Sequence, residues 1–266
     1  MTELLQTTQS ADGTTIAYEA EGTGPPLLVI GGALSDRNGA APYVPLLSDR
    51  FTVVRYDRRG RGDSGDTQPF APEREFEDVE ALIAAVGAPV FVFGHSSGAA
   101  IGLHTARRGA PIRKLALYEP PFIVDDTRPP LPADHLERLR AMGPGEAVEY
   151  FMTEAVQVPP AAIAGMKSDP MWEGLRRVGH TLIYDNTIMW PHEQGEPLPR
   201  EWADELGPIP TLVIDGGESA TWIRNAVQAL AELLPNARRL TLEGCAHAAP
   251  PETVAAVLTD FFEEEQ

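Results

Sequence analysis

The sequence has very little cysteine, and this limits how the fold can be held together. Cys245 is the one cysteine among 266 residues, so no intramolecular disulfide can form. Long apolar runs are also missing, since none approaches the roughly 20 residues that a helix needs to cross a bilayer. The first residues show no basic segment followed by an apolar one, which a secretory signal would have. We therefore expect a cytoplasmic protein that is not bound to a membrane.

Positive charge is scarce as well. The chain has 21 Lys and Arg against 39 Asp and Glu, which gives a formal net charge of −18. Because an acidic surface repels nucleic acid and anionic lipid, we expect neither as a partner. No His/Cys cluster suits a metal ion, and no glycine pair has the spacing of a nucleotide-binding loop. We therefore expect no cofactor and no metal, and leave open whether the chain forms a homodimer.

Short apolar runs recur along the chain and predict strands. They cover residues 27–30, 51–56, 90–93, 115–118 and 212–214, with a more alternating run at 238–242 and a hairpin arm at 14–18. Runs without alternation are typical of strands that are buried on both faces, as in a mostly parallel sheet covered by helices. Helical patterns fall between them, at 75–86, 99–108, 220–234 and 251–262. This alternation predicts a doubly wound α/β sheet.

Residues 121–205 interrupt the alternation. The segment is rich in Pro, Met and Trp and shows helical patterns at 134–142, 145–157 and 170–184 without convincing strands. An insertion of this kind between two sheet strands is typical of a helical lid over the strand ends. We therefore predict a single domain, 1–266, with a core of 1–120 and 206–266 and a lid at about 121–205.

The strongest chemical motif lies at residues 94–98, which are Gly-His-Ser-Ser-Gly. It follows an apolar strand and opens a helix, which is the context that a G-x-S-x-G nucleophile turn needs. Glycines two residues to either side let the strand and the helix approach closely. The hydroxyl of Ser96 is then exposed at the carboxyl edge of the sheet, near the positive end of the helix.

A nucleophilic serine needs a base, and His247 is the best-placed histidine. It lies in a loop after the last predicted strand and before the last helix, where an imidazole can reach the strand ends. The other histidines lie beside the serine, on the next helix or in the lid: His95, His104, His135, His180 and His192.

With these residues in place, the chain resembles the α/β-hydrolase superfamily over nearly all of its length outside the lid. Residues 31–33, Gly-Gly-Ala, occupy the place of that family's His-Gly-x oxyanion loop. Residues 56–64 resemble its D-x-R-G-x-G-x-S turn, and 210–214 resemble its penultimate strand. For the arginine-rich turn we prefer a structural role over an anion site. The resemblance implies the α/β-hydrolase fold, but it is weakly specific for substrate.

The resemblance also implies an oxyanion hole made by backbone N–H groups. One donor should belong to Ser97, directly after the nucleophile, and the other to Ala33. Two such fixed donors are commonly worth about 3 kcal/mol each. Gly31 stands where the family usually has a histidine, so we expect this loop to be held in a different way.

The acid partner of the histidine departs from the family pattern. The usual aspartate follows the strand at 211–214, but this sequence has Ser219 there. Glu218 lies one residue before the position where the family has its aspartate. Glu119, at the end of the preceding strand, is on the same edge of the sheet, and some superfamily members take their acid from that strand. We prefer Glu119 as the acid and keep Glu218 as the alternative. A third possibility is that neither pairs with His247 and the triad is incomplete.

These residues predict a serine hydrolase that cleaves a carboxylic ester, thioester or lactone through Ser96, His247 and Glu119. The lid suggests a small-molecule substrate that is partly apolar, in a pocket lined by Phe122, Tyr184 and Trp190. Two alternatives remain: a cofactor-free lyase, cyclase or perhydrolase on the same fold, and a small-ligand-binding protein without enzymatic activity. Intact Ser96 and His247 argue against the second.

Overall fold

The computed structural model describes residues 5–87 and 89–264 and places eight strands in one sheet. The strand order is β1-β2-β4-β3-β5-β6-β7-β8. In this order, every neighbouring pair from β4 to β8 is parallel. The pairs β1–β2 and β2–β4 are antiparallel. The strands are β1 (Gln6–Gln9), β2 (Thr15–Glu21), β3 (Pro26–Ile30), β4 (Thr52–Tyr56), β5 (Val90–His95), β6 (Ile112–Tyr118), β7 (Thr211–Gly216) and β8 (Ala237–Leu242). The predicted mostly parallel α/β sheet is therefore confirmed.

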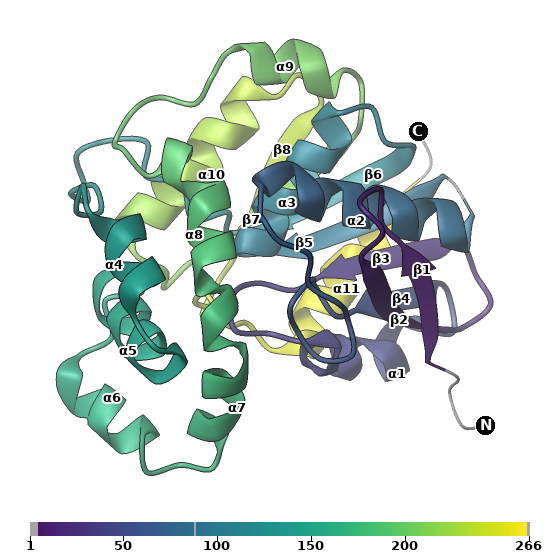
Figure 1. The fold of residues 1–266 in the computed structure, drawn as a ribbon. Coiled ribbons are helices and arrows are strands. Elements are labelled where there is room, and N and C mark those ends of the chain that lie inside the picture. The colour runs from purple at the N-terminus through teal and green to yellow at the C-terminus, as the bar shows by residue number, and fades with distance from the viewer. Residues whose placement is uncertain (1–4, 88, 265–266) are drawn as a thin grey trace.

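Helices cover both faces of the sheet (Figure 1). One face packs against α2 (Pro72–Val86), α3 (Ser97–Arg107) and α10 (Thr221–Leu233). The other packs against α1 (Val44–Leu47), the short 3₁₀ turn η1 (Arg37–Tyr43) and α11 (Pro251–Glu263). The central strands are apolar on both sides because each side meets a helix layer. Within the described part of the chain, no helix combines the length and the apolar character needed to cross a bilayer.

A helical insertion connects β6 to β7 and lies beside the sheet, in teal and green in Figure 1. It consists of α4 (His135–Ala141), α5 (Pro144–Glu154), α6 (Pro160–Met166), α7 (Met171–Val178), η2 (Gly179–Thr181), α8 (Leu182–Met189), η3 (Trp190–His192) and α9 (Glu201–Leu206). Helix α8 anchors the insertion, because Ile188 and Met189 join the core cluster that also contains α3. The sequence patterns did not predict α1, α6, α9 or η1, and they implied β1 only as the first arm of the hairpin whose second arm was placed at 14–18.

The single helix predicted at residues 170–184 is wrong. The chain forms α7, turns through η2 at Gly179 and continues as α8 to Met189. Close packing explains the break, since a Cβ atom on Gly179 would lie 2.4 Å from the backbone oxygen of Pro144 at the start of α5. The turn directs α8 back across the core, where it contacts α3.

Candidate active site

Ser96 lies on a strained turn between β5 and α3. Its φ of 57° and ψ of −126° are unusual for a residue with a side chain. Both motif glycines are required by contact distance. A Cβ atom on Gly94 would lie 2.5 Å from the oxygen of Gly98, and one on Gly98 would lie 2.2 Å from the oxygen of Ile30. The glycines therefore permit the tight packing that exposes the serine at the carboxyl edge of the sheet.

Glu119, at the end of β6, lies beside His247 in this structure. Its Oε2 is 2.6 Å from Nδ1 of His247, and its Oε1 accepts a hydrogen bond of 2.7 Å from the backbone N–H of Gly216. The carboxylate is fully buried, and its backbone has a φ of 47°. Both carboxylate oxygens are thus engaged, and one of them faces the imidazole.

Neither carboxylate near the end of β7 contacts the imidazole. Glu218 is exposed, and its backbone N–H donates to the oxygen of Cys245 at 2.8 Å. Asp215 is buried and accepts hydrogen bonds from Arg239, at 2.6 and 3.0 Å. Of the two carboxylates considered from the sequence, the structure therefore brings Glu119 to the histidine.

His95 supports the loop that carries His247. Its Nε2 is 2.8 Å from the backbone oxygen of His247, and a carbonyl can only accept, so Nε2 carries the proton. Burial, and then the neighbouring His247, lower the pKa of His95 to about 4. His95 is therefore neutral near pH 7 and fixes the backbone of His247. The hydroxyl of Ser96 and the ring of His247 both line one cavity, but they form no hydrogen bond with each other in this structure.

Two buried arginines hold the loop at residues 31–33. Arg58 donates to the oxygen of Gly31 at 3.4 Å, and Arg61 donates to the oxygen of Gly32 at 2.8 Å. The carbonyl of Gly32 and the N–H of Ala33 belong to one trans peptide unit and therefore point to opposite sides. While the carbonyl faces Arg61, the N–H of Ala33 faces away from it. The arginine-rich turn thus holds a loop in which Gly31 has no side chain of its own to anchor it.

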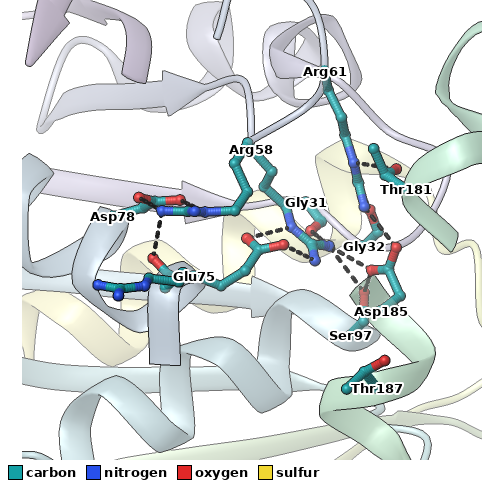
Figure 2. Close-up of polar contacts among 12 residues, drawn as sticks. Gly31, Gly32, Arg58, Arg61, Glu75, Asp78, Ser97, Thr181, Asp185 and Thr187 are labelled. Carbon is teal, nitrogen blue, oxygen red and sulfur yellow. Dashed lines mark hydrogen bonds and ion pairs between the residues drawn. The ribbon is translucent and has the colours of Figure 1, made fainter. Parts of the chain in front are cut away.

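Asp185, on α8, connects the same arginines to the helical insertion (Figure 2). Its Oδ1 accepts hydrogen bonds of 2.6 Å from both Arg58 and the hydroxyl of Ser97, and its Oδ2 accepts one of 2.6 Å from Arg61. Burial alone would raise the pKa of Asp185, but Arg58 and Arg61 hold it below the ordinary value. Glu75, on α2, completes the network by binding Arg58 at 2.8 and 3.0 Å.

Other members of the 56–64 turn also have structural partners. Arg59 forms a two-pronged ion pair with Asp78, at 2.7 and 2.8 Å. Ser64 donates its hydroxyl hydrogen to the backbone oxygen of Asp57 at 2.6 Å and accepts from the N–H of Ala17. These contacts agree with the structural interpretation of this turn.

Ser96, Ser97, His247 and the loop at residues 31–33 line a cavity of about 710 Å³ between the strand ends and the insertion. Its wall is mostly apolar, and it includes Leu34, Tyr43, Phe151, Met152, Leu175 and Met189. The backbone of Gly32 lies directly against the serine, since a Cβ atom on it would be 2.9 Å from Cβ of Ser96. Within residues 5–87 and 89–264, no group of three His, Cys, Asp or Glu is placed to hold a metal ion.

The three aromatic residues expected in the pocket lie elsewhere. Phe122 is fully buried in the core cluster beside Trp202. Tyr184 turns toward Asp66, to which it donates a hydrogen bond of 2.8 Å. Trp190 stacks with His135 inside the insertion. The expectation fails because large aromatic side chains in a helical insertion hold its helices together as readily as they line a pocket.

Two polar residues in the cavity wall were missed from the sequence. Arg128 and Glu193 both line the cavity and are 4% and 6% exposed. Each lies in an irregular segment of the insertion, outside any motif, so no sequence pattern marks it. Trp222, at the start of α10, lines the cavity as well and was also missed.

Comparisons with known proteins agree with this geometry. Residues 27–259 match the Alpha/beta hydrolase family. A solved alpha/beta hydrolase from Sphaerobacter thermophilus DSM 20745 is 51% identical, with a TM-score of 0.90, and the match covers 97% of this chain and 100% of that one.

Two curated relatives extend the comparison. A pimeloyl-[acyl-carrier protein] methyl ester esterase of Stenotrophomonas maltophilia (strain K279a) is 29% identical over 91% of this chain and 95% of its own length. The uncharacterized hydrolase YraK of Bacillus subtilis (strain 168) is 35% identical, over 36% of this chain and 37% of its own length. With its family match spanning most of the sequence, this chain belongs to the Alpha/beta hydrolase family.

Proposed function

We propose that this protein is a serine hydrolase that cleaves a carboxylic ester, thioester or lactone. One observation carries the proposal: the imidazole of His247, bonded at Nδ1 to the buried carboxylate of Glu119, lies in the same cavity as the strained Ser96. A serine, a histidine and a carboxylate on one cavity are the parts that acyl transfer requires. The relative named as a methyl ester esterase supports ester chemistry.

In the proposed reaction, the oxygen of Ser96 attacks the acyl carbon while Nε2 of His247 takes the hydroxyl proton. Glu119 orients the ring through Nδ1 and stabilises the imidazolium that forms. The backbone N–H groups of Ala33 and Ser97 donate to the oxyanion. His247 then returns the proton to the leaving group, and a water molecule, activated by the same histidine, releases the acid and restores Ser96.

The first experiment measures the intact mass of the protein after incubation with a fluorophosphonate. We expect one adduct on the wild type and none on Ser96→Ala, because only an activated serine reacts readily with this reagent. The Ser96→Ala protein must fold as the wild type does, which circular dichroism checks. A folded wild type without an adduct would contradict the proposal.

The acid is tested by two amide substitutions. We expect Glu119→Gln to lower kcat for ester hydrolysis by about 10³- to 10⁴-fold, as loss of the triad carboxylate does elsewhere. Glu218→Gln is the matched variant, since this residue is exposed and its carboxylate forms no hydrogen bond or ion pair with His247. We expect a loss below about tenfold from it. The reverse ranking would assign the acid to Glu218.

A further inference from the structure

The mostly apolar cavity contains a buried cation without an anionic partner. Within the described chain, Arg128 makes one hydrogen bond, from Nη2 to the backbone oxygen of Glu154 at 2.8 Å. Its guanidinium carbon lies 4.3 Å from the centre of the Trp222 ring. No Asp or Glu of residues 5–87 and 89–264 forms an ion pair with it. A guanidinium has five N–H groups, so most of its donor capacity remains for a ligand.

Glu193 lies close enough to Arg128 for the two groups to interact electrostatically. However, Glu193 does not neutralise the positive charge of Arg128. The side chain is almost fully buried, and its Oε2 has no hydrogen-bond partner among the described residues. Burial raises the pKa of Glu193 to about 8, and Arg128 opposes this only in part. At pH 7 this carboxyl is therefore mostly protonated. It adds a neutral hydroxyl donor to the same wall of the cavity.

The hydrogen bond to the backbone of Glu154 does not by itself compensate for the burial of the Arg128 charge. It places the cation near the negative end of α5, which gives partial compensation. Burying an unpaired charge nevertheless destabilises the folded protein unless an opposite charge is supplied. Burial lowers the pKa of Arg128, yet a guanidinium remains protonated at physiological pH. A ligand that brings one negative charge would remove this cost.

We infer that the substrate carries a carboxylate in addition to its scissile acyl group, and that Arg128 binds this carboxylate inside the cavity. The inference rests on the proposed function, since it names the class of ester, thioester or lactone that the site takes. A planar carboxylate matches the fork of a guanidinium and balances its single charge. A dianionic phosphate would leave a surplus negative charge in an apolar cavity. The arginine also offsets the repulsion that a net charge of −18 exerts on any anion.

The test compares matched substrates. One set is the mono-p-nitrophenyl esters of straight-chain dicarboxylic acids, from succinic to suberic acid. The other set has a methyl group in place of the free carboxylate at each chain length. For at least one length we expect the wild type to show a kcat/KM about ten- to a hundredfold higher for the anionic ester, as a hydrogen-bonded charge pair implies.

Substitution of the arginine should remove this preference. We expect Arg128→Gln to bring the ratio of the two kcat/KM values toward one, mainly through a higher KM for the anionic ester, and Arg128→Lys to retain part of it. Arg177→Gln is the control, because it removes the same charge from an exposed position on α7. It should leave the ratio unchanged.

The outcomes separate this inference from the proposed function. Rapid hydrolysis of neutral esters without preference for any anionic ester overturns the inference and leaves the hydrolase assignment intact. If no ester is cleaved, the thermal shift of Ser96→Ala with the free dicarboxylates decides: stabilisation that Arg128→Gln abolishes supports the site, and its absence overturns it. If Arg128→Gln does not fold, the ratios of the wild type and of Arg128→Lys decide.

Discussion

Buried arginines flank the cavity at two places, and their surroundings differ. Arg58 and Arg61 lie behind the serine, where Asp185 and Glu75 engage their guanidinium groups through ion pairs. Arg128 is also buried, but within the described chain it has one backbone oxygen and one aromatic ring as partners. At both places the guanidinium groups are desolvated by burial. Only the first supplies the countercharge from the protein.

The difference separates two uses of a buried cation. A fully paired network fixes geometry, and here it holds the carbonyls of Gly31 and Gly32 and joins them to α8. An unpaired cation in a cavity wall is costly by itself and is stabilised by a ligand. If the two places do differ in this way, substitutions in the first should reduce stability, and substitutions in the second should change substrate preference.

The largest expected effect comes from Asp185→Asn. The substitution leaves Arg58 and Arg61 buried with much of their countercharge removed, which typically costs about 3–5 kcal/mol of unfolding free energy. Urea denaturation at pH 7 measures it. Glu149→Gln is the matched control, since Glu149 pairs with Lys167 at the surface and both are more than 40% exposed, and such pairs contribute about 0–1 kcal/mol. If both variants lost the same unfolding free energy, the ion pairs of Asp185 would contribute no more to stability than a pair at the surface.

The next effect concerns Glu193→Gln and depends on pH. Burial raises the pKa of Glu193 from its ordinary value of 4.5 to about 8 in the fold. Below about pH 4.5 both the folded and the unfolded state are therefore protonated, and the substitution should change little. As pH rises from 4.5 toward 8, the unfolded chain releases a proton that the folded chain retains, and the wild type loses stability. At pH 7 Glu193→Gln should therefore be more stable by as much as about 3 kcal/mol.

Denaturation curves at pH 4.5 and at pH 7 to 8 measure this difference. A variant that is less stable than the wild type at pH 7 would show that Glu193 is ionised and compensates Arg128. The contrast between the paired and the unpaired arginine would then disappear. Asp126→Asn, which changes an exposed carboxylate of the same insertion, controls for the general effect of removing one charge.

The sheet could be predicted because each central strand is a short apolar run, and such runs have few other interpretations. Ser96 lies in a motif whose two glycines leave no room for a Cβ atom, which would lie 2.2 or 2.5 Å from a backbone oxygen, so the sequence marks its turn directly. Glu119 could be proposed only as one of two carboxylates, because the choice depends on the distance to His247. The sequence cannot give that distance.

The pocket was the least predictable part. Part of its lining comes from the insertion, where an aromatic residue packs against other helices of the insertion or faces the cavity according to how these helices pack. Phe122 is in the core and Phe151 is in the cavity, although nothing in their local sequence distinguishes them. Arg128 belongs to no motif. Its unpaired state becomes evident only when the surrounding carboxylates have been placed.

The smallest expected effect tests how Arg128 is held. Trp222→Leu keeps the wall apolar but removes the ring that faces the guanidinium, an interaction worth about 0.5–2 kcal/mol. We expect the preference for the anionic ester to fall by about three- to tenfold, less than with Arg128→Gln, because the hydrogen bond to Glu154 still orients the side chain. Trp172→Leu is the matched control, since that ring faces Lys167 outside the cavity. An unchanged preference in Trp222→Leu would mean that the backbone contact alone sets the position of the cation.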